Sequence, residues 1–157
     1  MSHQRLNSTT ILVIEDSLMC QALIKAFLRE TGTILIMADT GGKALKLIKN
    51  REVDLVITDL RLPDTNGVEI LKTIKHNYPD VPVIVQTASN IEFNEEDCIK
   101  AGCDAYITKP YSRSVFIDTI ICCIQKKNIR QADFSRDINN DGIHLQPSMS
   151  APPGKYC

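Results

Sequence analysis

The chain of 157 residues has no tryptophan, only three histidines, and no apolar run near the ~18 residues of a membrane span. Its first residues, MSHQRLNSTT, lack the apolar core of a secretion signal. The formal net charge of −1 gives no overall field that would draw the protein to nucleic acid or to anionic lipid. We therefore expect a cytoplasmic protein that binds neither membrane nor nucleic acid directly.

Paired C-x-x-C spacing is also missing, although the chain has six cysteines. Most of them lie inside apolar, periodic segments, and the histidines are mostly near the termini. A zinc site would need ligands from these scattered positions, so we expect none. The cysteines are predicted to be reduced and to serve mainly as small core residues.

Length and composition predict one domain, because 157 residues correspond to about one unit at the usual ~150 residues per domain. A hydrophobic content of 43% with 24% charged residues is enough for a packed core. We predict an N-terminal extension over residues 1–8, the domain over 9–127, and a polar C-terminal tail over 128–157. That tail is too short for a separate DNA-binding output domain with its own core.

Five short apolar runs, rich in β-branched residues, predict five β-strands. They lie at residues 10–14, 33–37, 54–58, 81–87 and 104–108. Segments with helical spacing follow them, the last beginning near Ser112, and three runs are almost continuously apolar, as in strands covered on both faces. The alternation predicts an α/β fold with a doubly wound, open parallel sheet, whose ligands bind outside the carboxyl ends of the strands.

Polar residues stand where the apolar runs end. They are Glu15, Asp16, Asp59, Thr87 and Lys109. Three carboxylates brought close together repel one another unless a cation neutralises them, and oxygen ligands without histidine or cysteine favour Mg²⁺. Because Mg²⁺ commonly shares its coordination with phosphate, a phosphate ligand or a phosphorylated residue is expected at this edge of the sheet.

Asp59 is the candidate nucleophile toward an activated phosphoryl group, because it ends a buried run and an accessible loop follows it. Lys109 offers a mobile positive charge for phosphate oxygens, and Thr87 offers a hydroxyl. Each of these residues alone is more often a turn former, a helix cap or a solvated side chain. Their occurrence at successive strand ends of one sheet makes the combination specific.

Four segments, VIEDS, VITDLRLPDTNG, VIVQTAS and AYITKP, resemble in content and order the receiver domain of two-component response regulators. The resemblance covers roughly residues 9–127, and the chain is similar to the stand-alone, chemotaxis-regulator-like form of that domain. It implies a flavodoxin-like sheet of five parallel strands in the order 2-1-3-4-5, with five helices.

The resemblance makes Asp59 the phosphoacceptor and Mg²⁺ the cofactor. Glu15 and Asp16 would form the acidic metal pair, and Asp59 and the backbone carbonyl of Arg61 would be further ligands. Lys109 would be the counter-ion of the phosphoryl group, and the Lys109–Pro110 bond is expected to be cis. These roles are implied by the resemblance, residue by residue.

The resemblance also implies a switch, because phosphorylation adds about −1.5 to −2 charges to an acidic site. Thr87 would move toward the phosphoryl group, and the switch aromatic Tyr106 would then turn inward. The output would be a change of protein binding on the face formed by the fourth helix, the fifth strand and the fifth helix.

The partners implied are a sensor histidine kinase or a histidine phosphotransfer protein, and a downstream target protein; a homodimer is left open. No enzyme activity is expected beyond self-phosphorylation and self-dephosphorylation at Asp59. Two alternatives remain beside this signalling function. One is a phosphorelay carrier that passes the group to a histidine phosphotransfer protein. The other is a haloacid-dehalogenase-like phosphatase, although that family has a second Asp two residues after its nucleophile, where this chain has Arg61.

Overall fold

The computed structural model describes residues 6–88 and 94–140, with side chains up to residue 136. In this part of the chain, five strands form one parallel sheet in the order β2-β1-β3-β4-β5, which confirms the predicted topology. The strands are β1 (Thr10–Ile14), β2 (Ile34–Ala38), β3 (Leu55–Asp59), β4 (Val83–Ala88) and β5 (Ala105–Lys109). Residues 1–5 of the predicted extension and 141–157 of the predicted tail lie outside the described residues.

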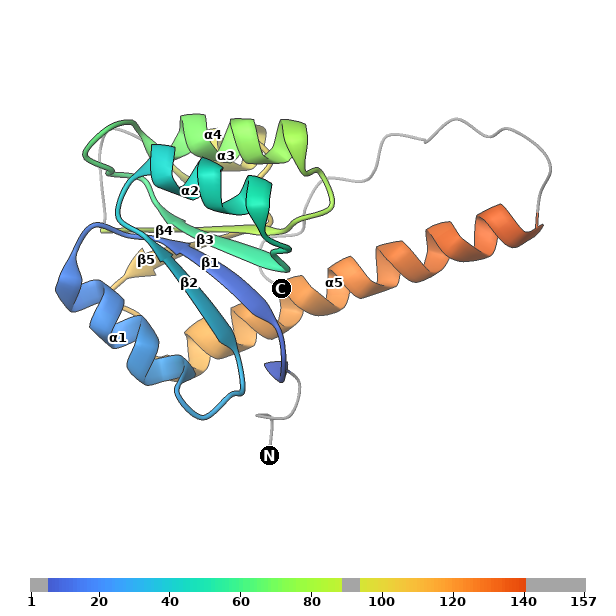
Figure 1. Cartoon of the computed structure of the whole chain (residues 1–157), viewed down its shortest axis with the longest axis horizontal. Coiled ribbons are helices and arrows are strands. Elements are labelled where there is room, and N and C mark those ends of the chain that lie inside the picture. Colours follow the sequence, from blue (N-terminus) through green and yellow to red (C-terminus); the bar gives the residue numbers. More distant parts are fainter. Residues whose placement is uncertain (1–5, 89–93, 141–157) are drawn as a thin grey trace.

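Helices cover both faces of the sheet (Figure 1). One face carries α1 (Leu18–Leu28) and α5 (Arg113–Asn140); the other carries α2 (Gly41–Asn50), α3 (Gly67–Asn77) and α4 (Glu95–Lys100). The first four helices each begin at a polar side chain that accepts a backbone N–H, which satisfies one of the free donors of the first turn. These caps are Ser17, Thr40, Asn66 and Asn94.

The period of two along each strand divides the core into two layers. In β1, Ile11 and Val13 pack toward α1 and α5, whereas Leu12 and Ile14 pack toward α2 and α3. All four side chains are fully buried. The continuously apolar runs in the sequence therefore reflect strands that are covered on both faces.

The last helix is longer than the apolar pattern indicates. Residues 128–140, which the sequence assigns to the polar tail, continue α5, and their described side chains are all exposed. The segment contains no glycine or proline before residue 141, and its arginine, glutamine and alanine residues favour helix without a core to cover. At ~1.5 Å per residue, the 28 residues of α5 span about 42 Å.

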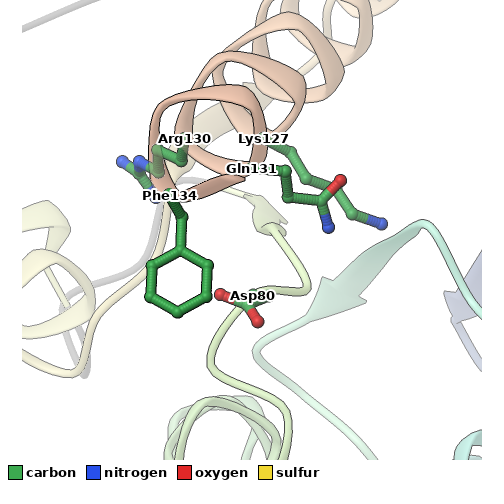
Figure 2. Close-up of a pocket in the computed structure, with 5 residues that line it drawn as sticks. All are labelled: Asp80, Lys127, Arg130, Gln131 and Phe134. Carbon is green, nitrogen blue, oxygen red and sulfur yellow. The ribbon is translucent and has the colours of Figure 1, made fainter. Parts of the chain in front are cut away.

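Two ion pairs hold this helix against the amino-terminal edge of the sheet. Lys127 Nζ lies 3.3 Å from Asp54 Oδ1, and Arg130 Nη1 lies 3.6 Å from Asp104 Oδ1. Figure 2 shows Lys127 and Arg130 on α5 above Asp80, which lies in the loop between α3 and β4. The Phe134 side chain points down from the same helix beside Asp80. The hollow between them is shallow and lies at the sheet edge opposite the carboxyl ends of the strands.

The five cysteines in the described part of the chain are free, as the sequence predicts. Cys98, Cys103 and Cys123 are buried, and burial raises the pKa of Cys98 to about 11 and that of Cys103 to about 12. Both thiols therefore stay protonated near neutral pH and behave as small core residues. None of the helices described, α5 included, combines the length and apolar character that a bilayer crossing needs.

Candidate functional site at the carboxyl ends of the strands

Strand register brings several polar side chains to one place. Asp59 in β3 pairs in register with Gln86 in β4, and Glu15 follows Ile14, which pairs with Thr58 just before Asp59. By the alternation that points Ile57 and Ile84 toward α1 and α5, Asp59 and Gln86 point to that same face. Lys109 follows Ile107 in β5 on this face as well.

The ammonium of Lys109 lies between two carboxylates. Its Nζ is 2.6 Å from Asp59 Oδ2 and 2.7 Å from Glu15 Oε2. Glu15 is 1% exposed and Asp59 is 8% exposed, so both ion pairs are shielded from solvent. The structure thus brings together three of the residues that the sequence singles out, Asp59 from β3, Lys109 from β5, and Glu15 directly after β1.

Each carboxylate has a further donor. The backbone N–H of Arg61 donates to Asp59 Oδ1 at 2.9 Å, and the N–H of Ser17 donates to Glu15 Oε1 at 3.1 Å. Burial raises the pKa of Glu15, although Lys109 and Ser17 act against this. Burial alone would lower the pKa of Lys109, but its hydrogen bonds to Asp59 and Glu15 outweigh burial and hold that pKa above its usual value. Lys109 is therefore a permanent cation at neutral pH.

The loop after Asp59 folds back tightly. The N–H of Gly67 donates to the carbonyl of Leu60 at 2.8 Å, and Arg61 forms an isolated antiparallel bridge with Asn66. A Cβ on Gly67 would overlap the carbonyl oxygen of Asp59 and lie 2.7 Å from Leu60 Cα. Only glycine lets the start of α3 pass this close to the backbone that carries the Asp59 carboxylate.

The other predicted site residues lie around this centre. Asp16 is exposed beside Glu15. Thr87 is buried, and its hydroxyl donates to the carbonyl of Ala88 at 3.0 Å. Tyr106 is partly buried against the core beneath α3 and α4, on the opposite face of the sheet from Lys109. Desolvation raises the pKa of Tyr106. The Lys109–Pro110 bond is cis, as the resemblance implies.

Two polar residues that the sequence reasoning missed complete the centre. The Gln86 side-chain amide donates to Glu15 Oε2 at 3.2 Å, and its oxygen accepts a hydrogen bond from the Tyr111 hydroxyl. The signal for Gln86 was present, because it is the one polar residue that shares a face with Ile84 in the fourth apolar run. The partner on the α5 side could not be found from the sequence, since no local pattern joins residues 86 and 111.

An apolar rim adjoins the centre. Leu18 is 79% exposed and Met19 is 84% exposed in the first turn of α1, and Leu23 lies one turn further on. A hollow of about 370 Å³ begins beside them. It is lined by Cys20, Leu23, Ala88, Lys109, Pro110 and Tyr111. The sequence reasoning also missed this rim, although two adjacent large apolar residues, one position beyond an acidic pair, are a visible signal.

The donor set suits a hard divalent cation in chemistry and charge. Glu15, Asp16 and Asp59 carry three negative charges against the one positive charge of Lys109. All candidate ligands are oxygens, which Mg²⁺ prefers. In the described residues, no three acidic, histidine or cysteine side chains are gathered closely enough to hold a metal by themselves. Between Glu15 and Asp59, the neutralising cation in this structure is the Lys109 ammonium.

Comparison with known proteins was made with both sequence and fold. Residues 11–121 match the family model described as the response regulator receiver domain. The polar-differentiation response regulators DivK of Brucella ovis and Brucella abortus are each 33% identical over 113 residues, which are 71% of this chain and 92% of theirs.

Solved structures give the same result. A CheY-like response regulator receiver domain protein from Methanospirillum hungatei is 27% identical, with a TM-score of 0.75, over 79% of this chain and 99% of that chain. The receiver domain of a sensor histidine kinase from Pseudomonas aeruginosa is 28% identical, with a TM-score of 0.69, over 75% of this chain and 98% of that chain. The latter structure has a magnesium ion coordinated in its active-site cleft.

Proposed function

Because this chain belongs to the receiver-domain family of response regulators, we propose that it is a phosphorylation-dependent signalling switch whose phosphoacceptor is Asp59. The observation that carries the proposal is the position of Lys109, whose ammonium lies 2.6 Å from Asp59 Oδ2. A phosphoryl group on this carboxylate would meet a fixed positive charge within reach of its oxygens. The reaction therefore needs little rearrangement of the site.

In the transfer itself, the Asp59 carboxylate is the nucleophile and the donor supplies the phosphoryl group. A carboxylate oxygen forms a bond to phosphorus while the bond between phosphorus and the donor breaks. The donor leaves with that electron pair, as imidazole from phosphohistidine or as acetate from acetyl phosphate. Asp59 becomes an acyl phosphate, and Lys109 offsets the charge of its oxygens.

We assign the cation site to Glu15, Asp16, Asp59 and the backbone carbonyl of Arg61. The excess of negative charge and the absence of soft ligands in this set support Mg²⁺, and the magnesium-bound receiver domain from Pseudomonas aeruginosa supports it by analogy. When bound, Mg²⁺ supplies a divalent charge that offsets the oxygens of the transferred phosphoryl group. Lys109 must then exchange part of its contact with Glu15 for contact with the phosphoryl group.

The test is phosphorylation by a small donor. After incubation with acetyl phosphate and Mg²⁺, the intact mass of the protein should increase by one phosphoryl group. Borohydride reduction and peptide mapping should then locate the acyl phosphate at Asp59. The matched control is Asp59→Asn, which keeps the size of the side chain but lacks the nucleophile. An adduct that persists in this variant would remove Asp59 from its proposed role.

The apolar rim is the surface that a protein donor must cover. A phosphohistidine can reach Asp59 only if its protein closes over the carboxyl ends of the strands. Leu18 and Met19 stand exposed there at the start of α1, and Leu23 lines a hollow together with Lys109. Burial of such side chains at an interface stabilises it by removing apolar surface from water. We therefore propose that this rim docks the histidine kinase or histidine phosphotransfer protein.

Met19→Glu is expected to separate donor binding from chemistry. Phosphorylation by a phosphorylated histidine phosphotransfer protein should slow by roughly tenfold, because the change removes apolar contact and places a charge in the interface. Phosphorylation by acetyl phosphate, which needs no docking surface, should keep its rate. Both are measured as initial rates of adduct formation by mass spectrometry.

The matched control is Ile129→Glu, which changes another exposed large apolar residue, on the far part of α5. It should alter neither rate. Equal rates for Met19→Glu and wild type with the protein donor would show that the rim does not dock it.

The proposed output is altered protein binding. The added negative charge draws Thr87 and Lys109 inward, and Tyr106, packed against the core near α4, responds on the opposite face of the sheet. A downstream target then binds the face of α4, β5 and α5, and the protein has no turnover chemistry beyond its own Asp59. We place it in the cytoplasm, where its donors act. Onward transfer of the group to a histidine phosphotransfer protein would identify it as a phosphorelay carrier instead.

A further inference from the structure

Gln86 is a buried polar side chain whose amide nitrogen and amide oxygen both form hydrogen bonds. It has no exposed surface, although it lies in a strand whose preceding residues, Val83 to Val85, are apolar core. Its amide nitrogen donates to Glu15 Oε2, and its amide oxygen accepts from Tyr111. Burying an amide without partners costs free energy, so this arrangement is held by its two hydrogen bonds.

The Glu15 carboxylate and the Tyr111 hydroxyl hold the two ends of the Gln86 amide. Because a carboxylate only accepts, the amide N–H must face Glu15, and the amide oxygen is left to accept from the Tyr111 hydroxyl. The flipped amide would place its oxygen against the Glu15 carboxylate and repel it. Burial raises the pKa of Tyr111 to about 12, so the hydroxyl keeps its proton near neutral pH.

Aromatic packing fixes Tyr111 in turn. Its ring stacks on that of Phe116 with ring centroids 5.2 Å apart, and the Phe27 ring lies 6.3 Å away at a tilt. Phe116 in α5 is fully buried, and Phe27 belongs to α1. A continuous set of contacts therefore runs from the interface of α1 and α5, through Tyr111 and Gln86, to Glu15.

Glu15 needs this support when the site works. At rest, one of its oxygens is shared by Lys109 and Gln86, at 2.7 Å and 3.2 Å. In the proposed function, Lys109 turns toward a phosphoryl group on Asp59. Among the described residues, the donors then left to Glu15 are the backbone N–H of Ser17 and the amide of Gln86. Of these two, Gln86 contacts the oxygen that Lys109 releases.

We propose that Gln86 and Tyr111 act as a pair of positioning residues: the Tyr111 hydroxyl anchors the oxygen end of the Gln86 amide, and the amide N–H holds the Glu15 carboxylate in place for the cation site. The inference rests on the proposed function, since it assigns Glu15 to that site. Neither residue touches the phosphoryl group or carries the chemistry. Mutation of a residue that orients a metal ligand commonly weakens metal binding by about 10- to 100-fold.

The test measures Mg²⁺ binding to the unphosphorylated protein by calorimetry, without any phosphodonor. Gln86→Met keeps the shape of the side chain but lacks both hydrogen bonds, and its dissociation constant for Mg²⁺ should rise by roughly tenfold. Tyr111→Phe should raise the constant by about threefold or more, because the buried amide oxygen then loses the hydrogen bond that holds the Gln86 side chain in place. The double variant should match Gln86→Met, since Tyr111 acts only through Gln86.

A second readout separates positioning from a merely structural role. At limiting Mg²⁺, the acetyl phosphate reaction of Gln86→Met should be slow, and saturating Mg²⁺ should restore it to the wild-type rate. A general loss of packing would lower the rate at every Mg²⁺ concentration. Tyr78→Phe, which removes a partly buried hydroxyl at the end of α3, is the matched control and should bind Mg²⁺ as the wild type does.

The outcomes are distinguishable. Dissociation constants of Gln86→Met and Tyr111→Phe that equal the wild-type value would overturn the positioning role and leave the proposed function intact. Multiplying effects in the double variant would also overturn it, because the two residues would then act separately. A wild type that binds no Mg²⁺ would instead count against the cation site itself. Should Gln86→Met fail to fold, Tyr111→Phe alone decides between these outcomes.

Discussion

Lys109→Met is expected to lower the free energy of unfolding by about 3 kcal/mol near neutral pH, the cost of breaking a buried ion pair by removing one partner. Lys109 Nζ lies within 2.7 Å of both Glu15 and Asp59, whose side chains are 2% and 12% exposed. Without the ammonium, two carboxylates face one gap with only neutral donors around them. Urea unfolding followed by circular dichroism measures the loss.

The free energy of unfolding of Lys109→Met should depend more strongly on pH than that of the wild type. Burial already raises the folded-state pKa of Glu15 above the usual value of a glutamate side chain. A raised folded-state pKa means that stability is fully present below the unfolded value and is lost as the pH rises through the folded one. Losing Lys109 raises the pKa of Glu15 further, so acidification from about pH 7.5 to about pH 5.5 should recover part of the lost stability.

The matched control is Lys43→Met. Lys43 also pairs with a carboxylate, Asp39, at 3.2 Å, but both side chains are more than half exposed. Its loss should cost less than about 1 kcal/mol. Equal losses in the two lysine variants would show that burial of the Lys109 site does not strengthen its ion pairs. Phosphoryl incorporation from acetyl phosphate should fall for Lys109→Met alone.

Gly67→Ala is expected to have an effect of similar size for a steric reason. The added Cβ would overlap the Asp59 carbonyl oxygen and lie 3.0 Å from the Asp59 carbonyl carbon. These atoms are backbone and cannot turn away as a side chain would, so either α3 or the end of β3 must shift. Overpacking of this kind typically costs about 1–3 kcal/mol, and we expect the upper part of that range.

Because the strain falls on the residue that carries the carboxylate, Gly67→Ala should also slow phosphorylation of the folded fraction. Gly42→Ala is the control, because a Cβ there would approach only the Asp64 side-chain oxygen, at 3.3 Å, on an exposed turn of α2. Alanine favours helix over glycine, so this variant should be as stable as the wild type or more so. If urea unfolding gives Gly67→Ala the same stability as Gly42→Ala, then the close approach of Gly67 to the Asp59 backbone does not require glycine.

The contacts of Asp59 and Lys109 could be predicted from sequence because parallel strands end at one edge of a sheet. Each residue directly ends an apolar run, so topology alone brings them together. The pair of Gln86 and Tyr111 depends on how the chain leaves β5 after the Lys109–Pro110 bond, which strand periodicity does not specify. The apolar pattern likewise could not give the length of α5, since residues beyond 127 continue the helix without burying a face.

The end of α5 projects from the domain, so a small tilt of this helix moves its last residues by a larger distance. Its base packs on the sheet through Phe116 and Ile120, and in the described part of the chain its ion pairs with the domain end at Lys127 and Arg130. About 20 Å of helix follows Lys127 at ~1.5 Å per residue. A tilt of α5 by about 10° around Lys127 would move Asn140 by roughly 3 Å. Sub-ångström repacking around the Tyr111 ring is thereby amplified at the tip, at the end of the molecule remote from Asp59.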